Sequence, residues 1–342
     1  MNEQLIARIV KAYGLSYTKL LPIEKGYRNE SHPFLTVGGQ FVNLIIYKRE
    51  PNILQTIRLA NRSSNYLAEK GFPARRTLDP RLICLQADNY RRYAGLYNYL
   101  PGQTIPWEGY TQQHIKLLGA MLSNMHAELK SLSINGYPLV TDQYLKYWQV
   151  MQHYFTNPGV NTALKRKLGL KIDTETLKQI KLILLASQQL HQQQVLHLDF
   201  VRSNILFTAN QTSHQPVDLM ISGVLDFEKT AYGHPLFDIA RSLAFLLVDC
   251  KYKTEAQVRK YFLLSGYQKR GSSPLPHVKL RGDNQADDLL ERLIDLFLLY
   301  DFYKFLKHNP YEDLADNEHF LRTRNILLTR QMIYGNDTIK QS

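Results

Sequence analysis

The chain of 342 residues is 44% hydrophobic and 21% charged, and its 42 Lys and Arg against 30 Asp and Glu give a net charge of +12. This length is typical of two domains, and the composition excludes a wholly disordered chain. The two cysteines, Cys84 and Cys250, lie far apart and outside any CxxC spacing. This excludes a disulfide scaffold or a cysteine-rich zinc module and suits a reducing cytosol.

Neither the N-terminal segment nor any apolar run indicates a membrane or secretory signal. The segment MNEQLIARIVKAYGL carries charges throughout, so we expect no signal peptide. The longest apolar run, LAFLLV at residues 243–248, is far shorter than the ~20 residues that span a bilayer. We therefore expect a soluble, cytoplasmic protein without a membrane span.

The positive charge is spread along the chain in pairs and triplets such as Arg75-Arg76, with no block of five or more like charges. This distribution favours a solvated cationic surface over a basic tail that grips nucleic acid. The alternation of aromatic and basic residues over 90–99 is typical of an RNA-stacking surface, but an ordinary half-buried strand explains it equally. Nucleic-acid binding is therefore kept as an alternative and is not expected.

The first hundred residues are expected to form a small sheet with helices. Apolar residues recur at helical spacing over 3–13 and 53–70. The expected strands cover residues 17–23, 33–37, 41–47, 82–86 and 92–99, with a turn at 24–28 and a hairpin turn at Gly38-Gly39. The pair Pro101-Gly102 then interrupts the pattern and marks the expected boundary.

Beyond this pair, helices are expected to dominate. The periodicity predicts them over 115–128, 142–155, 173–193 with Asp173 as N-cap, 236–249, 254–264, 286–307 and 317–334. Two short strands are expected at 204–208 and 223–227, and a polar loop at 265–285. The organisation predicts a sheet-rich lobe over residues 1–100 and a larger, mainly helical lobe over 101–342.

The chemistry-bearing residues gather in the segment HLDFVRSNILF, which contains His197, Asp199 and Asn204, and in LDFE, which contains Asp226. If the two short strands form a hairpin, Asn204 and Asp226 lie close together at its open end. An amide and a carboxylate oxygen are hard ligands suited to Mg²⁺. Asp199, five residues ahead of Asn204, can accept the proton of an attacking hydroxyl. These are the parts of a kinase-type phosphotransfer site.

HLDFVRSNILF followed by VLDFEKTAYGHPLFDIARSL resembles the aminoglycoside phosphotransferase and choline kinase family. The resemblance is strong over residues 195–248, looser over 20–130 and only architectural beyond 250. It implies an α+β, protein-kinase-like fold of two lobes. The N-terminal lobe of antiparallel sheet and helices would bind nucleotide, and the larger helical C-terminal lobe would carry catalysis and bind the acceptor.

The resemblance also assigns roles to single residues. Asp199 matches the catalytic base, and Asn204 and Asp226 match the Mg²⁺ ligands. Three residues match supporting positions: His197 holds the loop, Asp238 buttresses it, and Glu228 stabilises it or touches a second metal. Arg202 stands where the family often has proline; it could reach a phosphate, but a surface arginine is favoured.

The nucleotide-binding half departs from the family pattern. Related kinases anchor the phosphates with a strand lysine paired to a helix glutamate. Here Ile45 aligns with the lysine, so either Lys48 is the anchor or nucleotide is held differently. Asn61 or Arg62 stands at the glutamate position. The expected nucleotide contacts come from the loop and the interlobe segment: Gly26, Asn29, Lys48, Tyr99 and Leu100.

The resemblance implies an ATP- and Mg²⁺-dependent kinase that phosphorylates a hydroxyl group of a small molecule. The acceptor can be an amino sugar, an amino alcohol, a homoserine-like compound or a sugar. Two alternatives remain, a nucleotide-binding pseudokinase and an atypical protein Ser/Thr kinase. Against the second, Val201 stands where protein kinases carry a lysine, and no Ala-Pro-Glu segment follows Asp226.

Overall fold

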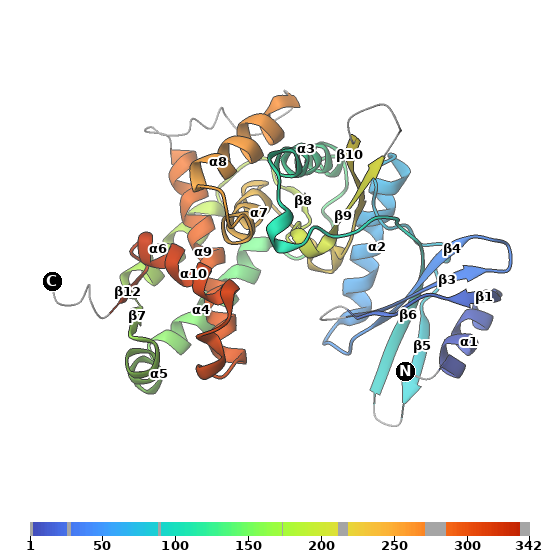
Figure 1. Cartoon of the computed structure of the whole chain (residues 1–342), viewed down its shortest axis with the longest axis horizontal. Helices are drawn as coiled ribbons and strands as arrows, with labels where there is room; N and C mark the ends of the chain where they lie inside the picture. The colour runs from blue at the N-terminus through green and yellow to red at the C-terminus, as the bar shows by residue number, and fades with distance from the viewer. Residues whose placement is uncertain are drawn as a thin grey trace. The chain divides into compact units, whose positions relative to one another are not determined.

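The computed structural model describes residues 3–25, 29–87, 90–172, 174–210, 218–270 and 285–335. The chain forms two compact units, each discontinuous in sequence (Figure 1). The first unit joins Met1–Thr104 to Asn204–Lys229, and the second joins Ile105–Ser203 to Thr230–Ser342. The predicted division into lobes 1–100 and 101–342 stays a prediction. The first compact unit also contains the later segment Asn204–Lys229.

The first unit contains an antiparallel sheet with the strand order β1-β3-β4-β6-β5, and β2 pairs with β3. In chain order its strands are β1 (Tyr17–Leu20), β2 (Glu24–Lys25), β3 (Asn29–Thr36), β4 (Phe41–Tyr47), β5 (Ile83–Ala87) and β6 (Tyr90–Asn98). The predicted hairpin is present, and Gly39 at its turn has a φ of 77°, which favours glycine. The short strand β2 replaces the first part of the predicted turn at 24–28.

Helices cover both faces of this sheet because the strands alternate apolar side chains to each side. Leu44 and Ile46 of β4 join the core beneath α1 (Glu3–Ala12). Ile45 and Tyr47 face the other way, into a cluster with Ile57 of α2 (Ile53–Glu69). The strand position that aligns with the expected lysine therefore contributes a buried apolar side chain.

The hairpin of β9 (Ile205–Asn210) and β10 (Asp218–Val224) belongs to the first unit by its contacts. The Val224 amide donates to the Pro73 carbonyl at 2.7 Å, and the Gln103 amide donates to the Phe207 carbonyl at 3.0 Å. The turn after β10 packs against α2. β10 ends earlier than predicted, so Asp226 lies in the following turn.

The second unit is helical. Its helices are α3 (Gln112–Leu129), α4 (Val140–Phe155), α5 (Pro158–Ala163), α6 (Thr174–Ser187), α7 (Leu236–Asp249), α8 (Glu255–Arg259), α9 (Gln285–His308) and α10 (Glu318–Thr329). Two strand pairs join distant segments, β8 (Gln194–Leu196) with β11 (Ala231–Gly233) and β7 (Leu170–Ile172) with β12 (Ile333–Gly335). Helix α7 is buried almost throughout and packs against α9. No helix in the described ranges is long and apolar enough to cross a membrane.

The segment after α8 differs from its prediction. A π-helix, Lys260–Tyr267, continues α8, so residues 265–270 of the expected loop are helical. This segment touches α3 through backbone, since a Cβ on Gly119 would lie 2.1 Å from the Phe262 carbonyl oxygen. Such close packing of distant segments leaves no periodic signal in the sequence. Residues 271–284 and the expected N-cap Asp173 lie outside the described residues.

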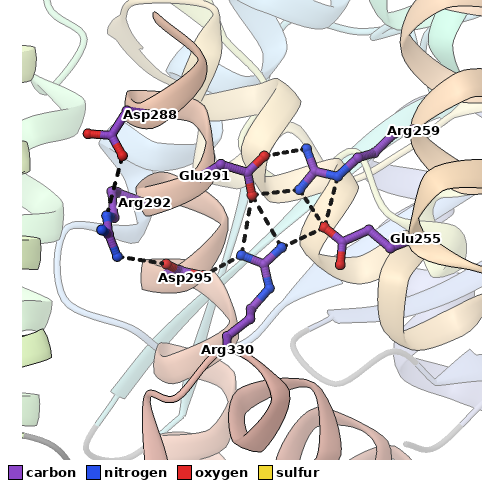
Figure 2. Close-up of polar contacts among 7 residues, drawn as sticks. All are labelled: Glu255, Arg259, Asp288, Glu291, Arg292, Asp295 and Arg330. Atoms are coloured by element: carbon purple, nitrogen blue, oxygen red, sulfur yellow. Dashed lines mark hydrogen bonds and ion pairs between the residues drawn. The ribbon is translucent and has the colours of Figure 1, made fainter. Parts of the chain in front are cut away.

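A cluster of alternating acids and arginines joins the helices α8, α9 and α10 (Figure 2). Its members are Glu255, Arg259, Asp288, Glu291, Arg292, Asp295 and Arg330. Arg330 follows the last residue of α10 and contacts Asp295 at 2.6 Å and Glu255 at 2.7 Å. Burial raises the pKa of Asp295, and Arg330 opposes that rise.

Replacing Arg330 by Met is expected to destabilise the protein by about 2 kcal/mol, because it leaves the buried carboxyl of Asp295 without its closest cation. Urea unfolding of both proteins measures the difference. The control is Arg292→Met in the same cluster, because the Arg292 side chain is 42% exposed and its ion pairs are long. We expect less than about 1 kcal/mol there. Equal losses in the two variants would contradict the assignment.

Candidate functional site

The predicted catalytic loop, residues 197–203, is held by a buried carboxylate at the start of α7. Asp238 accepts hydrogen bonds from the backbone amides of His197 at 2.8 Å and Leu198 at 2.5 Å. Leu198 has a φ of 59°, a left-handed conformation that costs a non-glycine residue about 1–3 kcal/mol. The two hydrogen bonds hold this strained turn, which leads directly to Asp199.

The carboxylate of Asp238 is itself held in place by His126, which in turn contacts Tyr267. The carboxylate lies 3.1 Å from His126 Nε2, and His126 Nδ1 lies 2.7 Å from the Tyr267 hydroxyl. Burial alone would raise the pKa of Asp238, but its hydrogen bonds with His126 and the loop amide of His197 lower it below its usual value. The group is therefore a buried anion with partners on two sides, and the supporting role of Asp238 stays a prediction.

Asp199 is 6% exposed and lies between its own loop and α7. Its backbone amide donates to His197 Nδ1 at 3.1 Å. Arg241 Nη2 lies 3.5 Å from the Asp199 carboxylate, and Arg241 Nε donates to the Leu198 carbonyl at 3.2 Å. The Ser242 hydroxyl donates to the Phe200 carbonyl at 3.0 Å. One buried helix thus fixes the backbone on both sides of Asp199.

The Arg202 side chain, which was predicted to lie at the surface, is 29% exposed and is held by two contacts. Its Nη1 donates to the Ile105 carbonyl at 3.2 Å, and its Nε lies 3.4 Å from the carboxylate of Asp249 at the end of α7. Burial raises the pKa of Asp249 to about 6, and the charge of Arg202 opposes that rise. The catalytic loop is therefore tied to α7 at a second carboxylate, Asp249. In contrast to Asp238, whose pKa is lowered, this carboxylate is on balance destabilised in its charged form by burial.

Replacing Asp249 by Asn is expected to stabilise the protein at pH 7 by about 2–3 kcal/mol. Because its folded-state pKa lies above the unfolded value, Asp249 contributes stability only at low pH, and this contribution is lost as pH rises through about 6. The gain should therefore vanish near pH 4. Thermal unfolding from pH 4 to 8 checks both parts, and a variant less stable than wild type at pH 7 would refute them.

The predicted metal ligands lie together at the open end of the β9–β10 hairpin. The Leu225 amide donates to the Asn204 carbonyl at 2.8 Å, which places Asn204 beside the residue that precedes Asp226. Asp226 has a left-handed φ of 58°. An amide and a carboxylate form a hard-oxygen donor set that fits Mg²⁺, which completes its shell with water and phosphate oxygens. Within the described ranges, no three His, Cys, Asp or Glu residues group into a metal site.

Glu228 belongs to a buried ion pair that the sequence did not indicate. Arg75 Nη2 lies 3.0 Å from Glu228 Oε1, and the two side chains are 5% and 4% exposed. Burial would raise the pKa of Glu228, but the positive charge of Arg75 and its hydrogen bond lower it below its usual value. Arg75 also lies over the Tyr97 ring, 4.3 Å from its centroid. In the sequence, Arg75-Arg76 resembles any other basic surface pair, so no local signal marked it.

The predicted nucleotide contacts lie in the first unit. Asn29 Oδ1 accepts from the Lys48 amide at 3.4 Å, and the exposed Lys48 side chain lies beyond the end of β4. Tyr99 is half-buried and packs against Phe41 with 5.8 Å between ring centroids, and Leu100 follows it. Gly26 lies outside the described residues. The nucleotide-binding role of these residues stays a prediction.

A hydrogen-bonded network occupies the helix-facing side of β4, where the family pattern predicts a lysine–glutamate pair. The hydroxyls of Tyr47 and Tyr97 lie 2.6 Å apart, and Tyr97 donates to Asn61 Oδ1 at 3.0 Å. Asn61 is one of the two residues that align with the expected glutamate. The nearby cation is Arg75, which comes from the segment after α2.

Comparison with known proteins agrees with these features. Residues 19–262 match the model of the "Phosphotransferase enzyme family". Hydroxylysine kinase of Danio rerio is 21% identical over 257 residues, which cover 72% of this chain and 70% of that protein. An amicoumacin kinase in complex with AMP-PNP, Ca²⁺ and Ami has a TM-score of 0.67 at 16% identity, covering 96% of this chain and 94% of its own. A microcompartment-associated aminopropanol kinase has a TM-score of 0.65 at 13% identity, covering 96% and 98%. The predicted α+β, protein-kinase-like fold is confirmed.

Proposed function

Because the chain belongs to the phosphotransferase enzyme family and is a kinase of small molecules, we propose that it transfers the γ-phosphate of ATP to the hydroxyl group of an amino alcohol. The acceptor class is supported by two relatives, which are named for hydroxylysine and aminopropanol. Both compounds carry an amine and a hydroxyl group. The use of ATP is supported by the amicoumacin kinase, whose complex holds AMP-PNP and Ca²⁺.

The observation that carries this proposal is the clamped loop that presents Asp199. Asp199 would orient the acceptor hydroxyl and take its proton as the new bond to phosphorus forms. Asp238 and Arg241 hold the backbone of Leu198, so the carboxylate is set in place before the acceptor binds. Preorganised groups of this kind reorganise little during reaction.

Asn204 and Asp226 would hold a divalent cation, which we propose to be Mg²⁺. When bound, Mg²⁺ neutralises phosphate charge and holds the nucleotide in a reactive geometry. Asn204 supplies a neutral oxygen and Asp226 a charged one, and the backbone hydrogen bond between Leu225 and Asn204 fixes their separation. The backbone around Gly26 and the segment with Tyr99 and Leu100 would contact the nucleotide.

An acceptor screen tests the proposal. The purified protein is incubated with ATP or GTP, Mg²⁺ and single acceptors: hydroxylysine, 1-amino-2-propanol, ethanolamine, choline, homoserine, an aminoglycoside and a sugar. Mass spectrometry identifies the phosphorylated product, and Asp199→Asn serves as the blank. We expect phosphorylation of at least one amino alcohol. Turnover only with the sugar, which carries no amine, would overturn the acceptor class, and no product with any acceptor would overturn the function.

The second candidate is a nucleotide-binding protein without turnover, favoured by the buried Ile45 at the expected lysine position. Calorimetry with Mg·ATP separates the two functions. Tight nucleotide binding together with no product in the complete screen would favour this candidate.

A further inference from the structure

The first unit lacks the lysine–glutamate pair at its expected place but contains a buried arginine–glutamate pair elsewhere. Ile45 stands at the position of the lysine, and Asn61 or Arg62 at that of the glutamate. Arg75 lies in the segment after α2, and Glu228 lies two residues after Asp226. These elements are far apart in the chain, yet Nη2 of Arg75 is 3.0 Å from Oε1 of Glu228.

We propose that Arg75 is a positioning residue that holds, through Glu228, the turn carrying Asp226 in the conformation that receives the metal-bound nucleotide. The inference rests on the proposed function and deepens it. Arg75 would thereby act on the metal ligand Asp226 through Glu228, from the segment after α2, and not on the nucleotide itself.

The backbone geometry supports this role. Asp226 has a φ of 58°, which a non-glycine residue keeps only when its surroundings impose it. The 3₁₀ turn Phe227–Lys229 follows at once and packs against α2. A bond that fixes Glu228 in the middle of this turn therefore restrains Asp226 next to it.

The charges of Arg75 and the two acidic residues also support the positioning role of Arg75. Asp226 and Glu228 are acidic residues two positions apart, and Glu228 lies in the turn that follows Asp226. Two carboxylates close to one another repel each other. The guanidinium of Arg75 cancels one of the two charges, which leaves a single net negative charge to face a divalent cation and an anionic nucleotide.

The cost of the pair argues against a role in stability alone. Removing two charges from water is expensive, and apolar residues of similar size often give equal or greater stability. The guanidinium is also incompletely bonded, because Arg75 Nε is buried and has no hydrogen-bond partner among the residues that the structure describes. The ring of Tyr97 fixes the guanidinium from one face.

The test separates positioning from folding by removing both charges together. Arg75→Met alone leaves Glu228 buried without its partner and can unfold the protein, whereas the double variant R75M/E228Q leaves no buried charge in the pair. Arg75→Lys keeps the charge. The control is R92M/E30Q, which removes a more exposed arginine–glutamate pair of the same unit with a spacing of 2.9 Å. Calorimetry gives the Kd for Mg·ATP without acceptor, and steady-state kinetics give each KM.

We expect R75M/E228Q to melt within a few degrees of wild type, to bind Mg·ATP at least tenfold more weakly and to keep the acceptor KM within twofold. R75K should recover part of the nucleotide affinity, and R92M/E30Q should bind like wild type. Wild-type nucleotide affinity in R75M/E228Q, or its failure to fold, would overturn the inference. A wild-type protein that binds Mg·ATP but phosphorylates no acceptor would instead overturn the proposed function, and the Kd comparison would still decide this inference.

Discussion

Replacing Asp199 by Asn is expected to lower kcat by a factor of about 10²–10⁴, the usual contribution of a positioned general base. An amide of the same shape keeps the packing of the buried side chain but cannot accept the proton of the acceptor hydroxyl. The variant should fold, because the backbone bonds of the loop to Asp238 and Ser242 do not involve the Asp199 carboxylate. Steady-state kinetics with the best acceptor of the screen measure the loss.

The matched control is Asp142→Asn, which changes an exposed carboxylate in the first turn of α4. Its kcat should stay within twofold of wild type. Thermal unfolding shows whether both variants are folded at the assay temperature. A folded Asp199→Asn protein with more than a tenth of the wild-type kcat would rule out Asp199 as the base.

Replacing Asp238 by Ala is expected to cost about 3–5 kcal/mol of stability, because it leaves the amides of His197 and Leu198 and the ring of His126 without their buried anion. Any folded fraction should lose kcat as strongly as the Asp199 variant, since the left-handed turn at Leu198 loses its support. Urea unfolding and kinetics on the same preparation measure both effects. A stable, active Asp238→Ala protein would contradict this assignment.

Asp238→Asn, which keeps the size of the side chain, tests the charge. The folded-state pKa of Asp238 is lowered, so its contribution is present above the unfolded pKa of about 4 and is lost as pH falls through the folded value. The stability of wild type should therefore decline in acid more steeply than that of the variant. Parallel slopes between pH 2 and 5 would show that Asp238 carries no such charge.

Local patterns predicted the parts of the site that lie near one another in the chain. The turn residues Gly38-Gly39 placed the hairpin of β3 and β4, and the strand periodicity brought Asn204 and Asp226 to one end of β9 and β10. The ranges predicted for α2 and α9 from their helical periodicity agree with the observed ranges to within one or two residues at each end. In each case the signal is local, because the turn residues or the repeat of apolar side chains that mark the element lie within a few residues of one another.

Interactions between distant residues could not be predicted in this way. Arg75 and Glu228 are separated by 153 positions, and each looks like a solvated charge until the fold buries it. Strand β12 pairs with β7 across a similar distance, so the helix predicted through residue 334 ends at Thr329 instead. The π-helix that continues α8 depends on its backbone contact with Gly119. Periodicity along one segment carries no information about which other segment it will meet.

The first compact unit is assembled from two stretches of chain, and this has a consequence for synthesis. A ribosome that has released Thr104 has made the sheet and α2, but not the hairpin β9–β10 or the turn with Asp226 and Glu228. At a typical elongation rate, the remaining residues up to Lys229 take on the order of ten seconds. During that time Arg75 lacks Glu228, so a nascent chain of the first 104 residues should be digested by protease faster than one of 229 residues.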